Sequence, residues 1–159
     1  MVAVIQRVTQ ASVTVDTQCI ASIAHGLLVL VGIATGDTHS DVQFMVEKIP
    51  GLRIFSDSKG HMNRSLKDIE GELLLVSQFT LLADLANGRR PSFDAAAPPE
   101  EARSLYHNLV EQFLALGLAV QTGRFGASMN VRLENDGPVT LILDSRAKEK
   151  SEKLKGLDP

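Results

Sequence analysis

Polar side chains interrupt an apolar run near the middle of the chain, and these are the residues best placed to do chemistry. The run, residues 72–82, is predicted to be a central strand buried on both faces. Ser77, Gln78 and Thr80 lie inside it. Burying a hydroxyl or an amide without a hydrogen-bond partner costs about 1–3 kcal/mol. These side chains therefore either satisfy a neighbouring backbone or line a pocket.

Ser77 and Thr80 suggest nucleophilic chemistry, but the groups that usually support it are missing. No G-x-S-x-G motif surrounds Ser77, and neither residue has an obvious His and Asp partner set. A hydrolase built on this stretch must act on a substrate that needs little activation. It would work by positioning and by backbone N–H donors at an oxyanion, where one donor is worth about 10²–10³ in rate.

A second unusual stretch, residues 135–140, is centred on Gly137-Pro138. One interpretation is a β-turn between two strands, because Asn, Asp, Gly and Pro dominate turns. The other is a cis Gly-Pro peptide bond, a form taken by roughly 5–6% of X-Pro bonds in folded proteins. A cis bond would turn successive carbonyls to one side, where they could grip an ammonium group. The residues alone leave both interpretations open.

The elements that must position these stretches form an α+β pattern. Strands linked by short turns are predicted over residues 2–15, 19–24 and 27–33, with antiparallel pairing, and further strands over 118–122, 129–133 and 139–143. One helix is predicted to start at a Thr38/Asp41 capping box, and another runs from Pro99 to a Gly117 cap. We expect one domain, residues 1–145, with both helices packed on the sheet. Residues 146–159 form a polar tail that we expect to be flexible.

Composition narrows the class of protein. The 159 residues are 44% hydrophobic and 22% charged, as in an ordinary globular domain. No apolar run reaches the ~18 residues of a membrane span, and the N-terminus lacks the features of a signal peptide. A single Cys19 fits a reducing compartment, so we expect a cytoplasmic protein. The four histidines show no ligand spacing, so we expect no metal and no cofactor.

The charge distribution bears on nucleic-acid binding. Net charge is −3, the tail carries +2, and the rest of the chain therefore carries −5. An acidic body argues against a protein that coats nucleic acid but permits a local basic patch. Arg89 and Arg90 stand together in a predicted loop, where they are either simply solvated or contact a phosphate or ribose.

Taken together, the two unusual stretches resemble the paired motifs of the D-aminoacyl-tRNA deacylase (D-tyrosyl-tRNA(Tyr) deacylase) family. The first motif is Ser77-Gln78-Phe79-Thr80-Leu81 and the second is Asn135-Asp136-Gly137-Pro138-Val139-Thr140. Flanking matches lie at residues 5–8, 11–15, 26–32, 53–57, 90–93 and 121–125. The resemblance covers nearly all of residues 1–145, and nothing carries over to the tail.

The resemblance implies a barrel-like, mainly antiparallel or mixed sheet and a homodimeric cytoplasmic enzyme without a cofactor. Such an enzyme hydrolyses the ester between a D-amino acid, or glycine, and the 3′-terminal adenosine of tRNA. Ser77, Gln78, Phe79 and Thr80 would line the pocket for the adenosine and the ester. The backbone N–H near Phe79 and the Thr80 hydroxyl would lie at the scissile carbonyl. Met129 would form part of the pocket wall.

The resemblance also implies how substrates are selected. Gly137 and Pro138 would reach across the dimer into the partner's pocket and hold the α-amino group with their carbonyls. Arg7 would brace this loop, and Asn135 belongs to the same substrate-binding set. A D side chain would point outward, whereas an L side chain would strike the Gly-Pro backbone, and glycine would escape the clash. The ribose 2′-OH can assist hydrolysis, and whether Thr80 attacks, orients water or only binds stays open.

Two other functions compete with this one. A nucleic-acid-binding module without catalysis would use Arg89, Arg90 and the Lys-rich tail, but the acidic body and scarce aromatic residues argue against it. A small-molecule amidase or esterase would use Ser77 as nucleophile. It would act on free esters that lack RNA and would be labelled by serine-reactive phosphonates.

Overall fold

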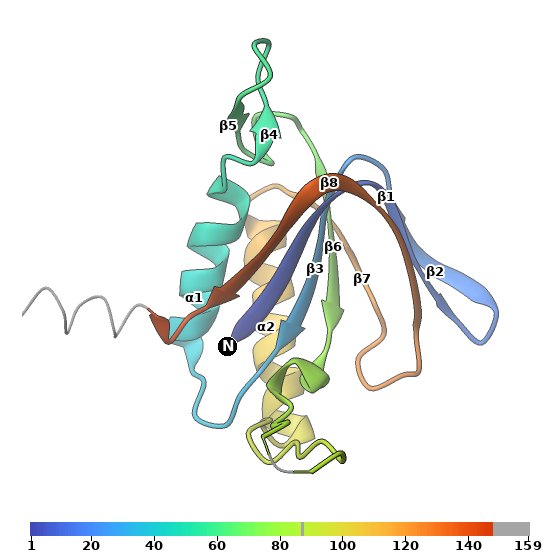
Figure 1. Cartoon of the computed structure of the whole chain (residues 1–159), viewed down its shortest axis with the longest axis vertical. Helices are drawn as coiled ribbons and strands as arrows, with labels where there is room; N and C mark the ends of the chain where they lie inside the picture. Colours follow the sequence, from blue (N-terminus) through green and yellow to red (C-terminus); the bar gives the residue numbers. More distant parts are fainter. Residues whose placement is uncertain (87, 148–159) are drawn as a thin grey trace, which may run out of the picture.

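A curled sheet with two helices on one side forms the protein, as Figure 1 shows for a computed structural model that describes residues 1–86 and 88–147. The six strands of the sheet follow the order β2-β1-β3-β6-β7, and β8 pairs with the other edge of β1. Their bounds are β1 Val2–Val15, β2 Gln18–Ile23, β3 Gly26–Gly32, β6 Glu72–Ser77, β7 Ala119–Thr122 and β8 Asn130–Asp144. The nearly closed sheet is mixed, because β1 pairs antiparallel with β2, β3 and β8 while β3–β6 and β6–β7 are parallel. The predicted α+β class and the antiparallel opening are confirmed.

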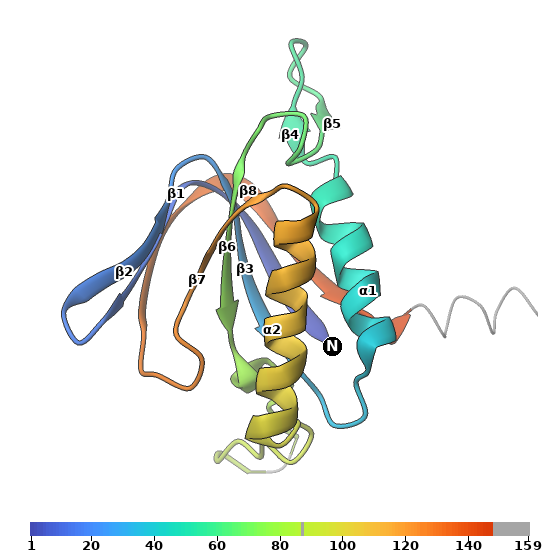
Figure 2. The same ribbon diagram turned by 180° about the vertical axis from the view of Figure 1, so that it is seen from behind.

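Both helices cover the same face of the sheet (Figure 2). α1, His39–Lys48, starts at the predicted capping box of Thr38 and Asp41, and the short 3₁₀ helix η1, Ile49–Gly51, follows it. α2 spans Pro99–Ala115, and Gly117 just beyond it has a φ of 76°, which favours glycine. No helix in the described ranges is long and apolar enough to cross a membrane.

The central strands β3 and β6 separate two apolar clusters because successive side chains of a strand point to opposite faces. The first cluster joins the sheet to both helices, and the second lies inside the curl of β1, β2 and β8. From β3 and β6, Leu27, Val29, Val31, Leu73 and Leu75 enter the first, and Leu28, Leu74 and Val76 enter the second. Burial on both faces explains the continuous apolar runs in the sequence.

The prediction of one strand over residues 72–82 is wrong at its C-terminal end. β6 stops at Ser77, and Phe79–Leu82 forms the 3₁₀ helix η2. The turn folds back on the end of β3, since a Cβ added to Gly32 would meet the Leu81 side chain at 3.2 Å. Leu82 is buried there. The apolar character of the segment thus comes from packing against β3 and not from a continued strand.

The prediction of two strands separated by a β-turn at residues 135–138 is also wrong. β8 pairs along a single partner, from Asn130 opposite Thr14 to Asp144 opposite Val2. The register shifts on either side of Val8, so the chain bulges locally and then continues in the same direction. A turn would have reversed the chain, and the Gly-Pro stretch is instead a distortion within one long strand.

A small hairpin of β4, Phe55–Ser56, and β5, Met62–Arg64, stands out from the body beyond α1 (Figure 1). The Asp57 carboxylate accepts hydrogen bonds from the backbone N–H groups of Lys59 and His61 and so closes its turn. These bonds hold the pKa of Asp57 below its usual value.

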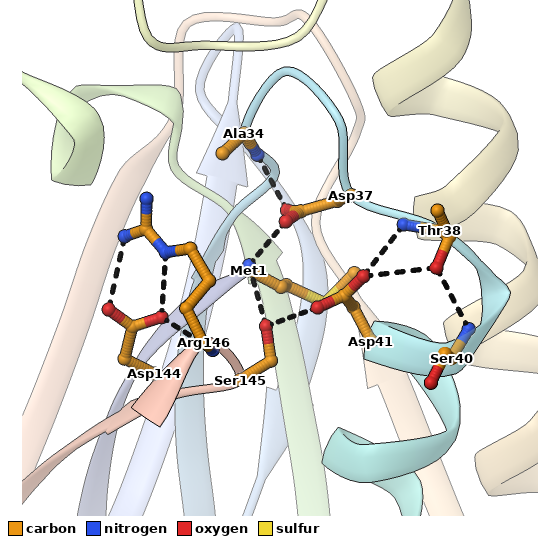
Figure 3. A network of polar contacts seen from close by, with 9 residues as sticks. All are labelled: Met1, Ala34, Asp37, Thr38, Ser40, Asp41, Asp144, Ser145 and Arg146. Atoms are coloured by element: carbon orange, nitrogen blue, oxygen red, sulfur yellow. Dashed lines mark hydrogen bonds and ion pairs between the residues drawn. The ribbon is translucent and has the colours of Figure 1, made fainter. Parts of the chain in front are cut away.

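A network of polar groups joins the first strand, the start of α1 and the end of β8 (Figure 3). We call Met1, Asp37, Asp41 and Ser145 the terminal cluster. The Met1 ammonium donates to Asp37 at 2.6 Å and to the Ser145 hydroxyl at 2.8 Å, and that hydroxyl donates to Asp41 at 2.6 Å. The Met1 side chain is fully buried and the Asp37 side chain is 4% exposed. The cluster therefore ties together segments that are far apart in the sequence.

Candidate active site

A cavity of about 570 Å³ opens where β3 and β6 end. Its walls come from four segments: the ends of β3 and β6, the approach to α2, and the stretch before and into β8. The lining residues are Val31, Ile33, Val76, Ser77, Gln78, Phe79, Ala96, Ala97, Pro99, Ala102, Phe125, Gly126, Ala127, Ser128, Met129 and Val131. A cavity of this size, mostly apolar with a few polar groups on one side, is typical of a small-molecule or nucleoside site.

The first motif forms the polar side of this cavity. Ser77 is the last residue of β6 and pairs with Val31, and the Gln78 backbone N–H donates to the Val31 carbonyl at 2.7 Å. Ser77, Gln78 and Phe79 line the cavity. Thr80 lies beside it in η2, where its hydroxyl accepts a hydrogen bond from the Gln78 side-chain amide. The four predicted residues are thus contiguous, and three of them face the space.

Met129 and Phe125 form the opposite wall, on the segment between β7 and β8. Gly123 permits this arrangement, since a Cβ at that position would meet the Met129 sulfur at 2.7 Å. Tyr106 of α2 supports the wall from behind, with its ring 5.6 Å from that of Phe125. Its hydroxyl donates to the Leu75 carbonyl of β6 at 2.8 Å, and burial raises the pKa of Tyr106. The phenol therefore stays neutral and anchors α2 to the strand that ends in Ser77.

The cavity walls contain no ionisable side chain among the described residues. Hydroxyls, one amide, backbone groups and apolar surface are all that they offer. No group of three or more His, Cys, Asp or Glu that could hold a metal lies within residues 1–86 and 88–147. The arrangement can bind, orient and donate hydrogen bonds, but it has no base of its own to activate a nucleophile.

Gly137 and Pro138 lie within β8, where its pairing with β1 is irregular, and both residues are exposed. The peptide bond between them is cis. Asn135 holds the ends of the stretch, with its side-chain amide donating to the carbonyls of Arg7 at 2.9 Å and Val139 at 3.0 Å. We call residues 135–139 the Gly-Pro loop.

Arg7 fixes the Gly-Pro loop from below. Its Nε lies 2.8 Å from the Asp136 carboxylate and donates to the Asp136 carbonyl at 3.1 Å. Another of its nitrogens donates to the Ile54 carbonyl, just before β4. His25 Nε2 stands 3.9 Å from the same carboxylate. The Arg7 side chain is only 10% exposed and two of its nitrogens contact the protein, so it orders the loop.

The two motifs lie at opposite ends of the sheet within one chain. Arg7 pairs with Leu27 at the start of β3, whereas Ser77 pairs with Val31 near its end. Four residues along a strand correspond to about 13 Å. The structure therefore brings Ser77, Gln78, Phe79 and Met129 together, and Arg7, Asn135, Gly137 and Pro138 together, but does not bring the two sets to one place.

Sequence reasoning missed several parts of the site. The small residues Ala96, Ala97 and Ala102 open the cavity, and only a contact map could have placed them opposite Ser77. The resemblance implied that Arg7 braces the loop, but it did not name the partner, Asp136, which is 129 positions away. Arg89 and Arg90 are exposed in the loop after η2, and their role stays a prediction.

Comparison with known proteins gives the same assignment along most of the chain. The model of the family described as D-Tyr-tRNA(Tyr) deacylase matches residues 4–144. A protein named D-aminoacyl-tRNA deacylase from Desulfitobacterium hafniense is 55% identical over 145 residues, which cover 91% of this chain and 97% of the relative. One of the same name from Roseiflexus sp. is 56% identical over 145 residues, with 91% and 94% covered.

Two solved structures share the fold. One, named c-Myc DNA Unwinding Element Binding Protein, superposes with a TM-score of 0.85 at 44% identity, covering 91% of this chain and 98% of that one. The other is described as a probable eukaryotic D-amino acid tRNA deacylase, with a TM-score of 0.78, 18% identity, and 90% and 98% covered. At that low identity the second likeness supports the fold alone.

Proposed function

The chain belongs to the D-Tyr-tRNA(Tyr) deacylase family and is a D-aminoacyl-tRNA deacylase, a hydrolase; within that activity, we propose that it removes D-amino acids and glycine from the 3′-terminal adenosine of tRNA and spares L-aminoacyl-tRNA. The observation that carries this proposal is the family match over residues 4–144, which includes both motifs. We place the reaction in the cytoplasm. Three further proposals rest on the geometry of the cavity and the Gly-Pro loop. They concern the group that activates the nucleophile, the second subunit at each site, and the rejection of L-substrates.

Hydrolysis is proposed to be assisted by the substrate. The cavity offers the Ser77 hydroxyl, the Gln78 amide and the backbone N–H near Phe79, and its walls carry no ionisable group among the described residues. An aminoacyl ester is already activated, and its ribose supplies a 2′-OH next to the scissile bond. The protein then has to position the ester and donate hydrogen bonds to the developing oxyanion, where one donor is worth about 10²–10³ in rate.

Two copies of the chain are proposed to form each site. The Gly-Pro loop lies about four strand residues from Ser77 in the same chain, so it cannot reach its own cavity. A second copy, related by a two-fold axis, would bring its loop to that cavity. The exposed apolar side chains of β8 support such a contact, since Ile142 is 77% and Leu141 36% exposed.

The partner's loop would select the substrate by shape. Its backbone carbonyls would accept hydrogen bonds from the α-amino group, while the cavity residues hold the ester. With both ends fixed, only the α-hydrogen and the side chain can exchange places. An L side chain would clash with the Gly137–Pro138 backbone, whereas a D side chain would point away from it. Glycine would be accepted because it has no side chain.

Hydrolysis of matched D- and L-tyrosyl-tRNA by the purified protein tests this proposal. We expect rapid loss of the D ester with the L ester cleaved no faster than in buffer, and measurable loss of glycyl-tRNA. Equal cleavage of both tyrosyl esters would contradict selection by the loop. No cleavage of either would contradict the activity itself.

A non-catalytic nucleic-acid-binding module is the second candidate. The 44% identical structure is named for binding a DNA element, which favours this alternative for the present chain. The acidic body of the protein opposes it. Steep salt dependence of RNA binding without ester hydrolysis would establish it, whereas turnover of D-tyrosyl-tRNA would not be explained by it.

A further inference from the structure

The hairpin that protrudes beyond α1 (Figure 1) carries several basic residues and is joined to the Gly-Pro loop through Arg7. We call residues 53–68 the basic hairpin. The segment carries four cations, Arg53, Lys59, Arg64 and Lys67, and two carboxylates, Asp57 and Asp68. All four cationic residues are exposed. Because the chain as a whole has a net charge of −3, this hairpin is a local exception.

Both carboxylates of the basic hairpin are engaged within their own turns. Asp57 accepts hydrogen bonds from two backbone N–H groups, and Asp68 accepts from the backbone N–H of Ser65 at 2.7 Å and from its hydroxyl at 2.8 Å. These bonds hold the pKa of Asp68 below its usual value. Two of the cations are free to meet a ligand, since the Lys59 and Lys67 side chains form no ion pair with the described residues.

Arg7 couples the basic hairpin to the Gly-Pro loop. One guanidinium contacts both the Ile54 carbonyl at the base of the hairpin and the Asp136 carbonyl of the loop. The Phe55 ring packs edge-on against His25 at 5.2 Å, and His25 in turn faces Asp136. The base of the hairpin and the loop are thus joined through Arg7 and His25, so whatever the loop approaches, the hairpin approaches too.

We propose that the basic hairpin of one subunit binds the phosphate backbone of the tRNA whose 3′ end occupies the partner's cavity. This inference rests on the proposed function, which puts the Gly-Pro loop at that cavity. From Ile54 to the turn that begins at Asp57 is about 10 Å along a strand. A stacked nucleic-acid strand rises about 3.4 Å per nucleotide, so the tip reaches phosphates about three nucleotides from the terminal adenosine.

Phosphate contacts of this kind have a distinct experimental signature. They position the nucleic acid without reading its sequence, and each one adds to the salt dependence of binding. The hairpin should therefore increase affinity for full-length tRNA of any sequence. It should have no effect on a substrate that ends at the terminal adenosine, because such a substrate has no phosphate within its reach.

The test compares two substrates and three variants of the full chain. Lys59→Gln/Lys67→Gln removes the two cations that have no intramolecular partner, Lys59→Arg/Lys67→Arg keeps the charge, and Met62→Gln changes an exposed, uncharged hairpin residue. KM and kcat are measured on D-tyrosyl-tRNA and on the 3′-D-tyrosyl ester of adenosine, over a range of KCl concentrations.

For the Gln pair we expect KM for full-length tRNA to rise about tenfold, and the log–log salt slope of kcat/KM to fall by about 1–2. Turnover of the adenosine ester should stay unchanged, and the Arg pair and Met62→Gln should behave as the wild type. Identical KM and salt slope for the Gln pair and the wild type on full-length tRNA would overturn the inference, whatever the hairpin then binds. That result leaves the hydrolase intact, whereas failure of the wild-type chain to cleave either ester would instead overturn the proposed function.

Discussion

The terminal cluster and the first motif, Ser77–Thr80, are both sets of polar groups at the edge of an apolar core. They differ in whether their polar groups bond to one another or face open space. In the terminal cluster the Met1 ammonium, Asp37, Asp41 and Ser145 bond to one another. In the first motif the side chains of Gln78 and Thr80 bond to each other. Ser77, Gln78 and Phe79 face an open cavity. The same kinds of atoms therefore bond to one another in the terminal cluster and face open space at the first motif.

This difference separates the expected consequences of mutation. Removing a member of a closed network leaves a buried partner unsatisfied and lowers stability. Removing a group that faces a cavity leaves no buried partner unsatisfied, so stability changes little and substrate binding or turnover changes instead.

Asp37→Ala should give the largest loss of stability. The ammonium of Met1 would stay buried without its carboxylate, at a cost of about 3 kcal/mol. Urea unfolding should show the loss, while kcat/KM at low temperature stays within about twofold of the wild type. Glu47→Ala, an exposed carboxylate on α1, is the matched control and should change stability by less than about 0.5 kcal/mol. A large drop in activity of folded Asp37→Ala would break the separation.

Ala127→Phe should produce the opposite pattern. Ala127 lines the cavity and is half-buried, so a phenyl group there occupies space that the substrate needs. We expect kcat/KM on D-tyrosyl-tRNA to fall at least about a hundredfold, as for other lost transition-state contacts. The melting temperature should change little. Retained activity would show that the substrate binds elsewhere.

Asn135→Ala should loosen the Gly-Pro loop without unfolding the chain. The carbonyls of Arg7 and Val139 would lose this donor, and because both residues are buried we expect stability to fall by about 1–3 kcal/mol. We expect kcat/KM for D-tyrosyl-tRNA to fall about tenfold, which is the effect of one hydrogen bond worth about 1.4 kcal/mol. Discrimination against L-tyrosyl-tRNA should fall with it. Unchanged selectivity would argue against a role of the loop in rejecting L-substrates.

Thr80→Ala should reduce activity by about tenfold or less. The Thr80 hydroxyl bonds to Gln78 beside the cavity, and substrate-assisted hydrolysis does not need it as a nucleophile. Single-turnover kinetics on D-tyrosyl-tRNA would measure the chemical step. Complete loss of turnover with intact binding would count against assistance by the 2′-OH.

Acid should weaken the terminal cluster by a small amount. Burial alone would raise the pKa of Asp41, but hydrogen bonds from Ser145 and Thr38 and the nearby ammonium lower it below its usual 3.8. A lowered folded-state pKa contributes stability above 3.8 that is lost as pH falls through the folded value. Solvent screening limits the effect to about 1 kcal/mol or less. Comparing urea unfolding of wild type and Asp41→Asn from pH 5 to pH 2 should show the difference between them shrinking.

The sequence predicts the helices and the buried strands because local rules decide them. The capping box at Thr38, the start at Pro99 and the glycine at 117 are all signals within a few residues. Continuous apolar runs likewise mark β3 and β6, which are buried on both faces.

Long-range contacts decide what the sequence does not predict. Leu81 and Leu82 fit a strand as well as a helical turn, and only their packing against Gly32 selects the turn. Asn135 and Gly137 fit a β-turn, and only pairing with β1 keeps that stretch inside β8. The polar members of the site could be named from the paired motifs, whereas its alanine-rich wall could not, because alanine carries no functional signal.

Complementation between two inactive subunits tests most directly the central claim that cavity and loop come from different copies. The first variant is Ala127→Phe, with a filled cavity and an intact loop. The second is Gly137→Val, whose added Cβ would meet the Asn135 side-chain oxygen at 2.8 Å and so displace the loop, while its cavity stays intact. A purified heterodimer of the two contains one cavity that faces an intact loop.

We predict that each variant alone is inactive on D-tyrosyl-tRNA and that the heterodimer recovers about half of the wild-type activity, since one of two symmetry-related sites is complete. Both homodimers should melt near the wild-type temperature, which separates lost sites from lost folding. A stable heterodimer as inactive as its parents would contradict the claim and place the cavity and the loop of each site in the same chain.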